Sequence, residues 1–467
     1  MKSTMNSRDN TPRQVEVWLS SESMPGRNSW FQGPQELPHQ LSQQAALNWS
    51  LPQVSELTTL HVTPEQTYQE ILGIGSSLEE TTVHNLSRMK ASEQLDILKQ
   101  LTNPQLGIGL NLFRITLGTS DFTAQPFYTY DDLEAGETDF QLKDFSIQKD
   151  IDLAIIATLR QLLDVAPNTI FFASPWSPPA WMKTGNSLKK GRLKEGQEYT
   201  AALAKYYRLA IQAYQEQGIP IHAMTLQNEP LLETDYPSCY MPPEVQQELA
   251  VALKKELIEH GLPTKIWMFD HNFSDVWSYI TPILNAEDGY AVVDGIALHD
   301  YEGEPEVMSE IHAAYPDKPL YLTERSLWGT QGADRMARYF RNYASSYNAW
   351  VTMLDSNIGT HQWPGTPGPT MLIQDASQVD LYWKTPEFYL LGQYSRFVER
   401  GAVRIGSSYG SVDTVTNVAF RNPDGGLVMV VINQTEVEQS FRIICEGSQF
   451  TAALSAKTVG TYCWQGL

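Results

Sequence analysis

The stretch TLQNEP at residues 225–230 decides the fold that this sequence predicts. It follows the apolar run IPIHAM at residues 219–224, which is typical of a buried strand. An acid next to an asparagine at the end of a buried strand contributes little to packing. It is well placed for chemistry at the rim of a parallel barrel, where side chains from the strand ends converge on a pocket.

A second stretch, LYLTERS at residues 320–326, has the same form, with an apolar strand followed by Glu324. Hydrolysis of a glycosidic bond with retention needs two carboxyl groups about 5 to 5.5 Å apart. One attacks the anomeric carbon, and the other acts as acid and then as base. We predict Glu324 as the nucleophile and Glu229 as the acid/base. The alternative is that both are ordinary rim acids in ion pairs.

Between residues 71 and 394, short apolar runs alternate with amphipathic helical patterns, as in repeated βα units around a parallel sheet. Eight runs favour an α/β fold of the (β/α)8 TIM-barrel type, in which Glu229 and Glu324 follow strands four and seven. No G-x-G-x-x-G follows any run, which argues against an open nucleotide-binding sheet. The predicted strands are residues 70–75, 112–116, 170–174, 221–225, 265–269, 293–298, 319–323 and 349–353.

Both ends of the chain predict β-structure outside the barrel. Residues 1–70 hold short strand patterns such as 15–19, and residues 395–467 hold four β-branched runs separated by turn signals. One of these turns, NPDGG at 422–426, is typical of a hairpin. We therefore expect a catalytic barrel at 71–394 and an attached β-sandwich built from both chain ends.

Charge and composition exclude several classes of partner. The 467-residue chain has 33 basic and 54 acidic residues, a net charge of −21, so nucleic acid is not an expected partner. The 12 Trp and 22 Tyr suit stacking on sugar rings, although a large aromatic core would have the same composition. No run of 18 apolar residues is present, so we expect no stable membrane insertion.

Few residues in the sequence bear on cofactors or on the cellular compartment. Cys239, Cys445 and Cys463 fit neither a zinc site nor a disulfide framework and indicate a reducing compartment. We expect no cofactor and no metal, because two carboxylates suffice and no cluster has ligand spacing. Residues 1–8 lack an apolar signal region, so we expect a cytoplasmic protein, although a secreted chain whose signal had been removed would look the same. The oligomeric state is open.

Seven blocks, in order along the chain, resemble glycoside hydrolase family 30, which contains glucosylceramidases and endo-β-1,6-glucanases. The resemblance runs from about residue 70 to the C-terminus. The blocks are RITLGTSDF (114–122), YTYDD (128–132), SPWSPPAWMK (174–183), QNEP (227–230), DGIALHDY (294–301), TERS (323–326) and YLLGQYSRFV (389–398).

The resemblance implies a (β/α)8 barrel with a β-sandwich, retention of configuration, and the roles already given to the two glutamates. By the resemblance Asp121 and Trp176 hold sugar hydroxyls. Asn228 can donate to the 2-hydroxyl, and Arg114 is a cation that can keep the nucleophile ionised. The predicted substrate-binding residues are Arg114, Asp121, Trp176, Asn228, His299, Tyr301 and Trp350.

Some of these residues have plainer alternatives. His299 and Tyr301 are expected near the catalytic pair, and Trp350 on the barrel floor. From the residues alone, His299 is equally well a core histidine and Asp121 a turn residue. Lys183 is expected to be a solvated loop residue.

Two features depart from the family pattern. Residues 356–364 stand where the family often has Gly-Gly-Pro-Asn, and Asp300 stands where an aromatic residue is common. The first departure leaves the preference for the leaving group open.

We predict a retaining β-glycosidase that hydrolyses β-D-glucosides in a carbohydrate or glycolipid, as a glucosylceramidase does. The alternative is an endo-β-1,6-glucanase, which needs an open groove instead of a closed pocket; loops 231–241 and 356–375 decide between them. A glucuronoxylanase is disfavoured, because a uronate needs basic residues and the chain is acidic. A non-catalytic carbohydrate-binding barrel is disfavoured, because both glutamates are present.

Overall fold

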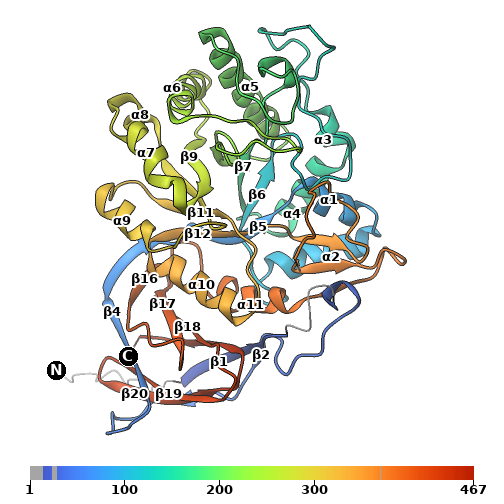
Figure 1. The fold of residues 1–467 in the computed structure, drawn as a ribbon. Coiled ribbons are helices and arrows are strands. Elements are labelled where there is room, and N and C mark those ends of the chain that lie inside the picture. Colours follow the sequence, from blue (N-terminus) through green and yellow to red (C-terminus); the bar gives the residue numbers. More distant parts are fainter. Residues whose placement is uncertain (1–13, 24–28, 369, 467) are drawn as a thin grey trace, which may run out of the picture.

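The computed structural model describes residues 14–23, 29–368 and 370–466. A closed barrel wrapped by helices lies above a β-sandwich in Figure 1, and segments from both ends of the chain meet in the sandwich. Residues 1–8, on which the prediction about a signal segment depends, lie outside the described residues. Among the described helices, none is both long enough and apolar enough to cross a membrane.

Eight parallel strands close the barrel in the order β10-β11-β12-β5-β6-β7-β8-β9, which confirms the predicted (β/α)8 architecture. Glu229 and Glu324 belong to the fourth and seventh strand units, as expected. The strands are β5 (Gly73–Ser77), β6 (Leu112–Thr116), β7 (Ile170–Ser174), β8 (Ile221–Thr225), β9 (Lys265–Asn272), β10 (Gly295–His299), β11 (Leu320–Glu324) and β12 (Ala344–Ala349).

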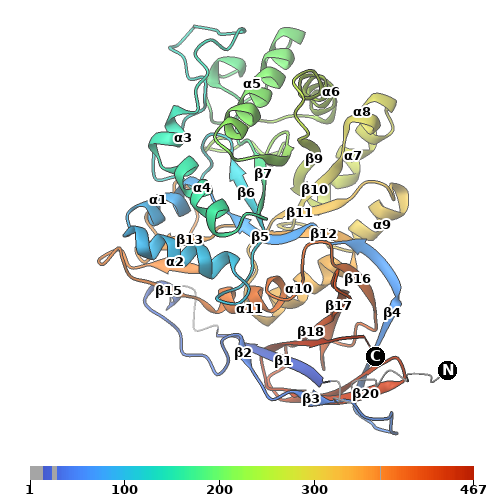
Figure 2. The same cartoon turned by 180° about the vertical axis from the view of Figure 1, so that it is seen from behind.

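Helices cover the outside of the barrel, as the two opposite views in Figures 1 and 2 show. Helix α5 ends at Glu216, and Gly218 follows it with a φ of +82°, a conformation that glycine adopts without strain. The helices are α1 (Glu80–Ser87), α2 (Ala91–Thr102), α3 (Gln148–Asp152), α4 (Ile155–Val165), α5 (Gln197–Glu216), α6 (Pro243–Glu259), α7 (Val276–Leu284), α8 (Glu287–Val292), α9 (Val307–Ala314), α10 (Gly329–Arg341) and α11 (Pro386–Ser395).

The predicted position of the eighth strand, residues 349–353, is wrong, because β12 ends at Ala349. Its buried residues include the polar Ser346 and Asn348, so the strand does not read as an apolar run. The Asn348 amide donates to the carbonyl of Leu112 at 2.9 Å, which satisfies a polar group inside the barrel. The apolar run that follows β12 instead forms part of the pocket wall.

The sandwich sheet runs in the order β2-β1-β21-β18-β17-β16-β4-β19-β20, with β3 paired to β1, and so combines strands from both chain ends as predicted. A separate small sheet of β13, β14 and β15 lies beside α1. These strands are β1 (Gln14–Ser21), β2 (Ser42–Gln43), β3 (Leu47–Asn48), β4 (Thr58–Glu70), β13 (Met353–Asp355), β14 (Leu372–Gln374), β15 (Tyr382–Lys384), β16 (Val403–Ser407), β17 (Thr416–Arg421), β18 (Leu427–Asn433), β19 (Gln439–Cys445), β20 (Ser448–Leu454) and β21 (Thr458–Trp464).

The barrel and one face of the sandwich share a hydrophobic cluster, and the sandwich has a second cluster of its own. Helices α10 and α11 lie between them in Figure 1. Phe340 of α10 packs edge-on against Phe420 of β17, with ring centroids 5.3 Å apart. One face of the sandwich therefore supports α11 and α10, the helix that follows β11.

Candidate active site

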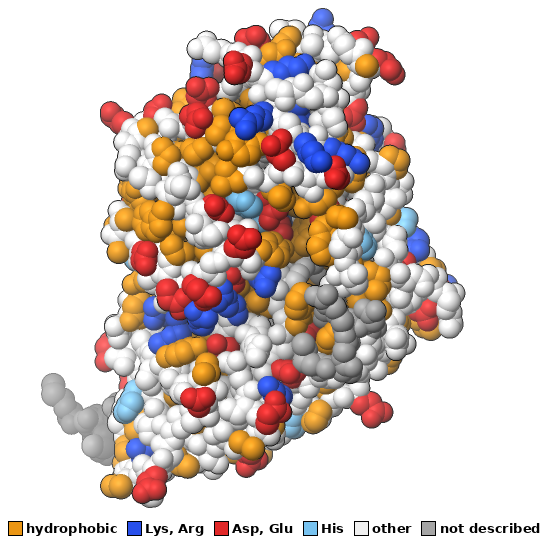
Figure 3. Space-filling view, in the orientation of Figure 1, with side chains coloured by type: hydrophobic (Ala, Val, Ile, Leu, Met, Phe, Trp, Pro, Cys, Tyr) orange, Lys and Arg blue, Asp and Glu red, His pale blue; other side chains and the backbone are white. Residues whose placement is uncertain are grey.

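The two glutamates lie at the carboxyl ends of barrel strands, where this fold places its functional sites. Glu324 is the last residue of β11, and Glu229 lies in the turn beyond β8. Both line a cavity of about 310 Å³. In Figure 3 the surface over the barrel is hollowed, and acidic atoms lie in the recess between hydrophobic side chains.

The carboxyl groups are close enough to act on one bond. One oxygen of Glu229 lies within 4.8 Å of one oxygen of Glu324. Inverting glycosidases need about 6.5 to 9.5 Å between their carboxyl groups, to leave room for water, whereas retaining ones need about 5 to 5.5 Å. The separation therefore fits direct attack by a carboxylate.

Glu229 is held in an unusual backbone conformation. Its φ is +45°, in the left-handed region that residues with a side chain rarely adopt. Its N–H donates to the carbonyl of Asp270 at 3.0 Å, which ties the turn to β9. Strain of this kind persists where the surroundings impose it, and it directs this side chain into the cavity.

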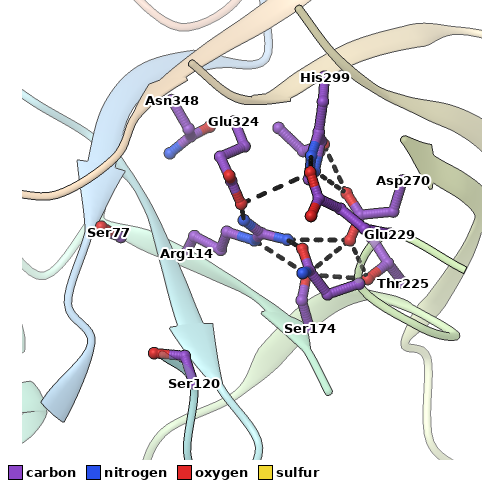
Figure 4. A network of polar contacts seen from close by, with 12 residues as sticks. Ser77, Arg114, Ser120, Ser174, Thr225, Glu229, Asp270, His299, Glu324 and Asn348 are labelled. Carbon is purple, nitrogen blue, oxygen red and sulfur yellow. Dashed lines mark hydrogen bonds and ion pairs between the residues drawn. The ribbon is translucent and has the colours of Figure 1, made fainter. Parts of the chain in front are cut away.

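Arg114 is the centre of the polar network in Figure 4. It lies within β6, is almost fully buried, and its Nη1 donates to Glu324 Oε2. Its Nη2 donates to Asp270 at 2.9 Å and to the amide oxygen of Asn228 at 2.8 Å. Burial alone disfavours its charge, but Asp270 and Glu324 raise the pKa of the guanidinium. A permanent cation thus faces one oxygen of Glu324, as predicted.

Asp270 is a site residue that the sequence analysis missed. A register shift between β9 and β10 leaves Asp270 as an extra residue, with a φ of +66°, so its carboxylate is directed inward. It is fully buried, which disfavours its charge, but Arg114 and His299 hold its pKa below the usual range. The run IWMFD at residues 266–270 has the same form as the two glutamate stretches, so the same reasoning could have identified it.

His299 is fully buried and lies between two carboxylates. Its Nδ1 is 3.2 Å from Glu229 Oε1, and its Nε2 is 3.0 Å from Asp270 Oδ1. Burial lowers the pKa of an imidazole, but Glu324 and Asp270 outweigh it and raise the pKa of His299 to about 10. Burial raises the pKa of Glu229, but the hydrogen bond and charge of His299, together with the charges of His271 and Arg114, outweigh burial and lower it. His299 is therefore part of the site as well as part of the core.

Tyr301 and Asn228 also reach the pair. The Tyr301 hydroxyl donates to Glu324 Oε1 at 2.7 Å. Because the oxygen of the Asn228 amide accepts from Arg114, its NH2 group is left to face the cavity that Asn228 lines. This orientation suits donation to a sugar hydroxyl.

One end of the cavity is closed by buried aromatic rings. Trp176 and Trp350 stack with centroids 5.2 Å apart, and Phe122 packs edge-on against Trp350. Asp121 lies beside them, and burial followed by the charge of Glu324 raises its pKa well above the usual range. Trp350 lies on the wall of the pocket just beyond β12, not within a strand.

The rim of the cavity carries aromatic residues that the sequence analysis did not single out. Tyr236, Trp328 and Trp363 are half-buried and line it, together with Leu232. They come from three separate loops, including the two that were expected to decide the shape of the site. Trp363 lies within residues 356–364, the first departure from the family pattern, and it stacks with Phe122 at 6.3 Å.

The prediction that Lys183 is a solvated loop residue is wrong. Its side chain is buried, and its ammonium group donates to the Ser177 hydroxyl at 2.9 Å and to the carbonyls of Leu188 and Ser238. It thereby joins the loop that carries Trp176 to two neighbouring loops. Local sequence could not show this, because burial of the ammonium group depends on the loop around Ser238, which is 55 residues away in the chain.

One group of possible metal ligands also emerges, although ligand spacing in the sequence indicated none. Among the described residues, Glu229, His299 and Glu324 each offer an atom within 4.8 Å of the others. Each of these side chains is already engaged, with Arg114, Asp270, Tyr301 or one another. The proximity is what a pair of catalytic carboxylates requires.

Two family models match the chain. The glycosyl hydrolase family 30 TIM-barrel domain matches residues 71–398, and the glycosyl hydrolase family 30 beta sandwich domain matches residues 401–462. The barrel and sandwich models of this one family together cover most of the chain.

Curated relatives and a solved structure agree with these matches. An endo-1,6-beta-D-glucanase of Neurospora crassa is 30% identical over 399 residues, covering 80% of each chain. The lysosomal acid glucosylceramidase of Mus musculus is 26% identical over 433 residues, covering 87% of this chain and 83% of its own. The solved structure of the endo-β-1,6-glucanase BT3312 superposes with a TM-score of 0.84 at 26% identity, covering 97% of this chain and 99% of its own.

Proposed function

The chain belongs to glycoside hydrolase family 30 and is a glycoside hydrolase; on that premise we propose that it cleaves internal bonds of β-1,6-linked glucan with retention of configuration. The observation that carries the chemistry is the separation of at most 4.8 Å between oxygens of Glu229 and Glu324 in one cavity. The two relatives that act on β-1,6-glucan support the substrate.

In the first step the Glu324 carboxylate attacks the anomeric carbon, and the bond from that carbon to the leaving oxygen breaks. Arg114 and Tyr301 hold one oxygen each of Glu324, which orients the attack. Glu229 gives a proton to the leaving oxygen, so that a neutral alcohol departs. A glycosyl ester of Glu324 remains.

The proton for this step is held by Glu229 and His299 together. Their hydrogen bond joins a carboxyl group to an imidazole whose pKa is raised to about 10, so the pair keeps one proton through neutral pH. The proton is transferred from His299 Nδ1 to Glu229 as negative charge develops on the leaving oxygen.

In the second step a water molecule replaces the leaving group. Glu229, now a carboxylate, takes a proton from that water, and the water oxygen attacks the anomeric carbon. The ester bond to Glu324 breaks, and the sugar leaves with its original configuration. Asn228 donates to the 2-hydroxyl, and Asp121, Trp176 and Trp350 hold the rest of the ring.

The aromatic rim supports internal cleavage. Tyr236, Trp328 and Trp363 line the cavity outside the ring-binding end and are half-buried, so part of each ring is accessible to further sugars. An enzyme that acts inside a glucan needs such platforms on sugars that do not react.

A second candidate is a β-glucosidase of the glucosylceramidase type. The closed aromatic end at Trp176 and Trp350 favours it, because a single sugar would fit there, and the mouse relative is a glucosylceramidase. It differs from the first candidate in what lies beyond the cleaved bond.

A substrate panel with early product analysis tests the proposal. We expect β-1,6-glucan to be shortened rapidly to a range of oligosaccharides, with the β-anomer appearing first by NMR, and slower action on glucosylceramide and β-1,3-glucan. The Glu324→Gln variant serves as the inactive control. Release of glucose alone, or preference for glucosylceramide, would replace the first candidate with the second; an α-anomer as first product would end the retaining mechanism.

A further inference from the structure

Arg335 of α10 holds the segment 300–304, just beyond β10, from outside the barrel. Asp300 is buried, and its two oxygens accept from Arg335 Nε and Nη2, each at 2.7 Å. A planar guanidinium group that donates two N–H bonds to one carboxylate fixes both the distance and the orientation of that carboxylate. The hydroxyl of Tyr339, also on α10, donates to Asp300 as well.

Arg335 also binds the other end of the segment. Arg335 Nη1 donates to Glu304 at 2.5 Å, and Nη2 donates to the carbonyl of Gly303 at 2.9 Å. The contacts with Asp300 and those with residues 303–304 lie on either side of Tyr301 in the chain. Figure 3 shows basic and acidic side chains gathered into one patch over the region where α9 and α10 lie in Figure 1.

Tyr301 needs such support, because 41% of its surface is exposed. Its hydroxyl nevertheless contacts Glu324, its N–H donates to Asn272 at 3.0 Å, and its ring lies 4.9 Å from the Arg325 guanidinium. A half-exposed tyrosine beyond the end of a strand keeps one rotamer only where the backbone beneath it is fixed.

Helix α10 is also linked to the nucleophile through the chain. It begins at Gly329, directly after the short connection that follows Glu324 at the end of β11. Arg335 therefore joins the element that follows Glu324 to the segment that carries Tyr301. The family commonly has an aromatic residue at the position of Asp300, whereas this chain has an ion pair there between Asp300 and Arg335.

We propose that Arg335 is a positioning residue for the reaction, which holds the Tyr301 hydroxyl on Glu324 by fixing the segment 300–304 through Asp300. This inference rests on the proposed function, in which Glu324 is the nucleophile. Arg335 does not touch the substrate; it acts through Asp300 and Tyr301.

The effect of losing the hydrogen bond from Tyr301 to Glu324 depends on the other groups that face Glu324. Arg114 on β6 and His299 on β10 face it as cations, Tyr301 faces it as a hydroxyl donor, and Asp121 and Glu229 face it as acids. An ionised carboxylate that loses one hydrogen-bond donor accepts a proton more readily. The acidic limb of the kcat/KM profile should then move to higher pH.

The test compares pH profiles of the full-length protein on dinitrophenyl β-gentiobioside. We expect Arg335→Met and Tyr301→Phe each to lower kcat/KM about tenfold on the acidic limb, as loss of one hydrogen bond to a charged group would. The double variant should lose no more than Tyr301→Phe alone, because both changes remove the same contact. Asp300→Asn should shift the acidic limb in the same direction, and it provides a second test if Arg335→Met does not fold.

Arg338→Met is the matched control. Arg338 lies one turn further along α10 and pairs with the exposed Glu304 and Glu306, but it makes no contact with Asp300. Its loss should leave the acidic limb in place. The inference is overturned if Arg335→Met lowers the melting temperature while its acidic limb stays with the wild type, or if the losses in the double variant multiply. Activity in Glu324→Gln would instead end the proposed function itself.

Discussion

At the scale of single residues, Glu229 and Glu324 carry the same chemical group but face different neighbours. Glu324 accepts hydrogen bonds from a buried guanidinium and from the Tyr301 hydroxyl, which hold its two oxygens in the orientation that the proposed attack requires. Glu229 lies 3.2 Å from His299 Nδ1, and contacts with His299 are the main causes that lower the pKa of Glu229 against burial. The difference in function therefore comes from the partners that the barrel brings to each side chain.

Removal of the Glu229 carboxyl group should separate the two steps. In Glu229→Ala we expect turnover of β-1,6-glucan to fall roughly 10²- to 10⁴-fold, the usual contribution of general acid–base catalysis. Dinitrophenyl β-gentiobioside, whose leaving group needs no proton, should still form the glycosyl ester. Added azide should then restore turnover and yield a β-glycosyl azide, measured by product NMR.

Glu324→Gln is the comparison for this experiment. It keeps the size of the side chain but removes the proposed nucleophile, so neither substrate should turn over and azide should have no effect. If azide rescued Glu324→Gln and not Glu229→Ala, the assigned roles would be reversed.

At the scale of elements, the start of α10 depends on a buried acid. Glu387 of α11 accepts from the N–H of Gly329 at 3.4 Å, and its other oxygen has no hydrogen-bond partner among the described residues. Burial raises the pKa of Glu387 to about 7, from an ordinary value of 4.5. The folded protein thus binds this proton more tightly than the unfolded chain.

Stability should therefore fall as pH rises from about 4.5 to about 7, because the folded state must release a proton that the unfolded chain has already lost. The loss linked to this group is of order 3 kcal/mol. Glu387→Gln should flatten the fall without removing it, since burial also raises the pKa of Glu79 to about 7. Melting temperature against pH measures the effect.

The exposed Glu310 on α9 is a suitable control. Glu310→Gln should leave the pH dependence of the melting temperature unchanged. An equally steep fall in Glu387→Gln would show that this carboxyl group is not the source.

At the scale of the whole molecule, the barrel and the sandwich should unfold together. Val418, Phe420, Val428 and Val430 of the sandwich belong to the same hydrophobic cluster as the barrel helices. Because this core is continuous, neither part can expose its face without cost to the other.

Phe420→Ala should lower the stability of the entire protein by about 3 to 5 kcal/mol, the usual cost of removing a buried phenylalanine side chain. We expect a single transition in calorimetry that moves as one to lower temperature. Phe420→Leu, which keeps most of the buried volume, should move it less. Two separate transitions, with only one displaced by Phe420→Ala, would contradict a shared core.

Much of the architecture was predictable from local patterns. Local patterns predicted eight strand units, a barrel and a sandwich from both chain ends, because strands buried on both faces are mostly continuous apolar runs and the helices that cover them are apolar on one face. The eighth strand was misplaced, because its polar Asn348 is satisfied inside the barrel by hydrogen bonds to the carbonyls of Ser76 and Leu112, which no local pattern reveals.

The amino-acid sequence by itself determined which acids would stand at the strand ends and in which family the chain belongs, since both depend on short runs of neighbouring residues. Only the tertiary structure decided how those acids are paired: that Asp270 and His299 join Arg114 beneath the carboxylates, that Lys183 is buried, and that Arg335 grips the segment of Tyr301. Each of these arrangements depends on contacts between segments far apart in the chain, such as that of Lys183 with Ser238, and on exclusion of water, which no stretch of sequence specifies alone.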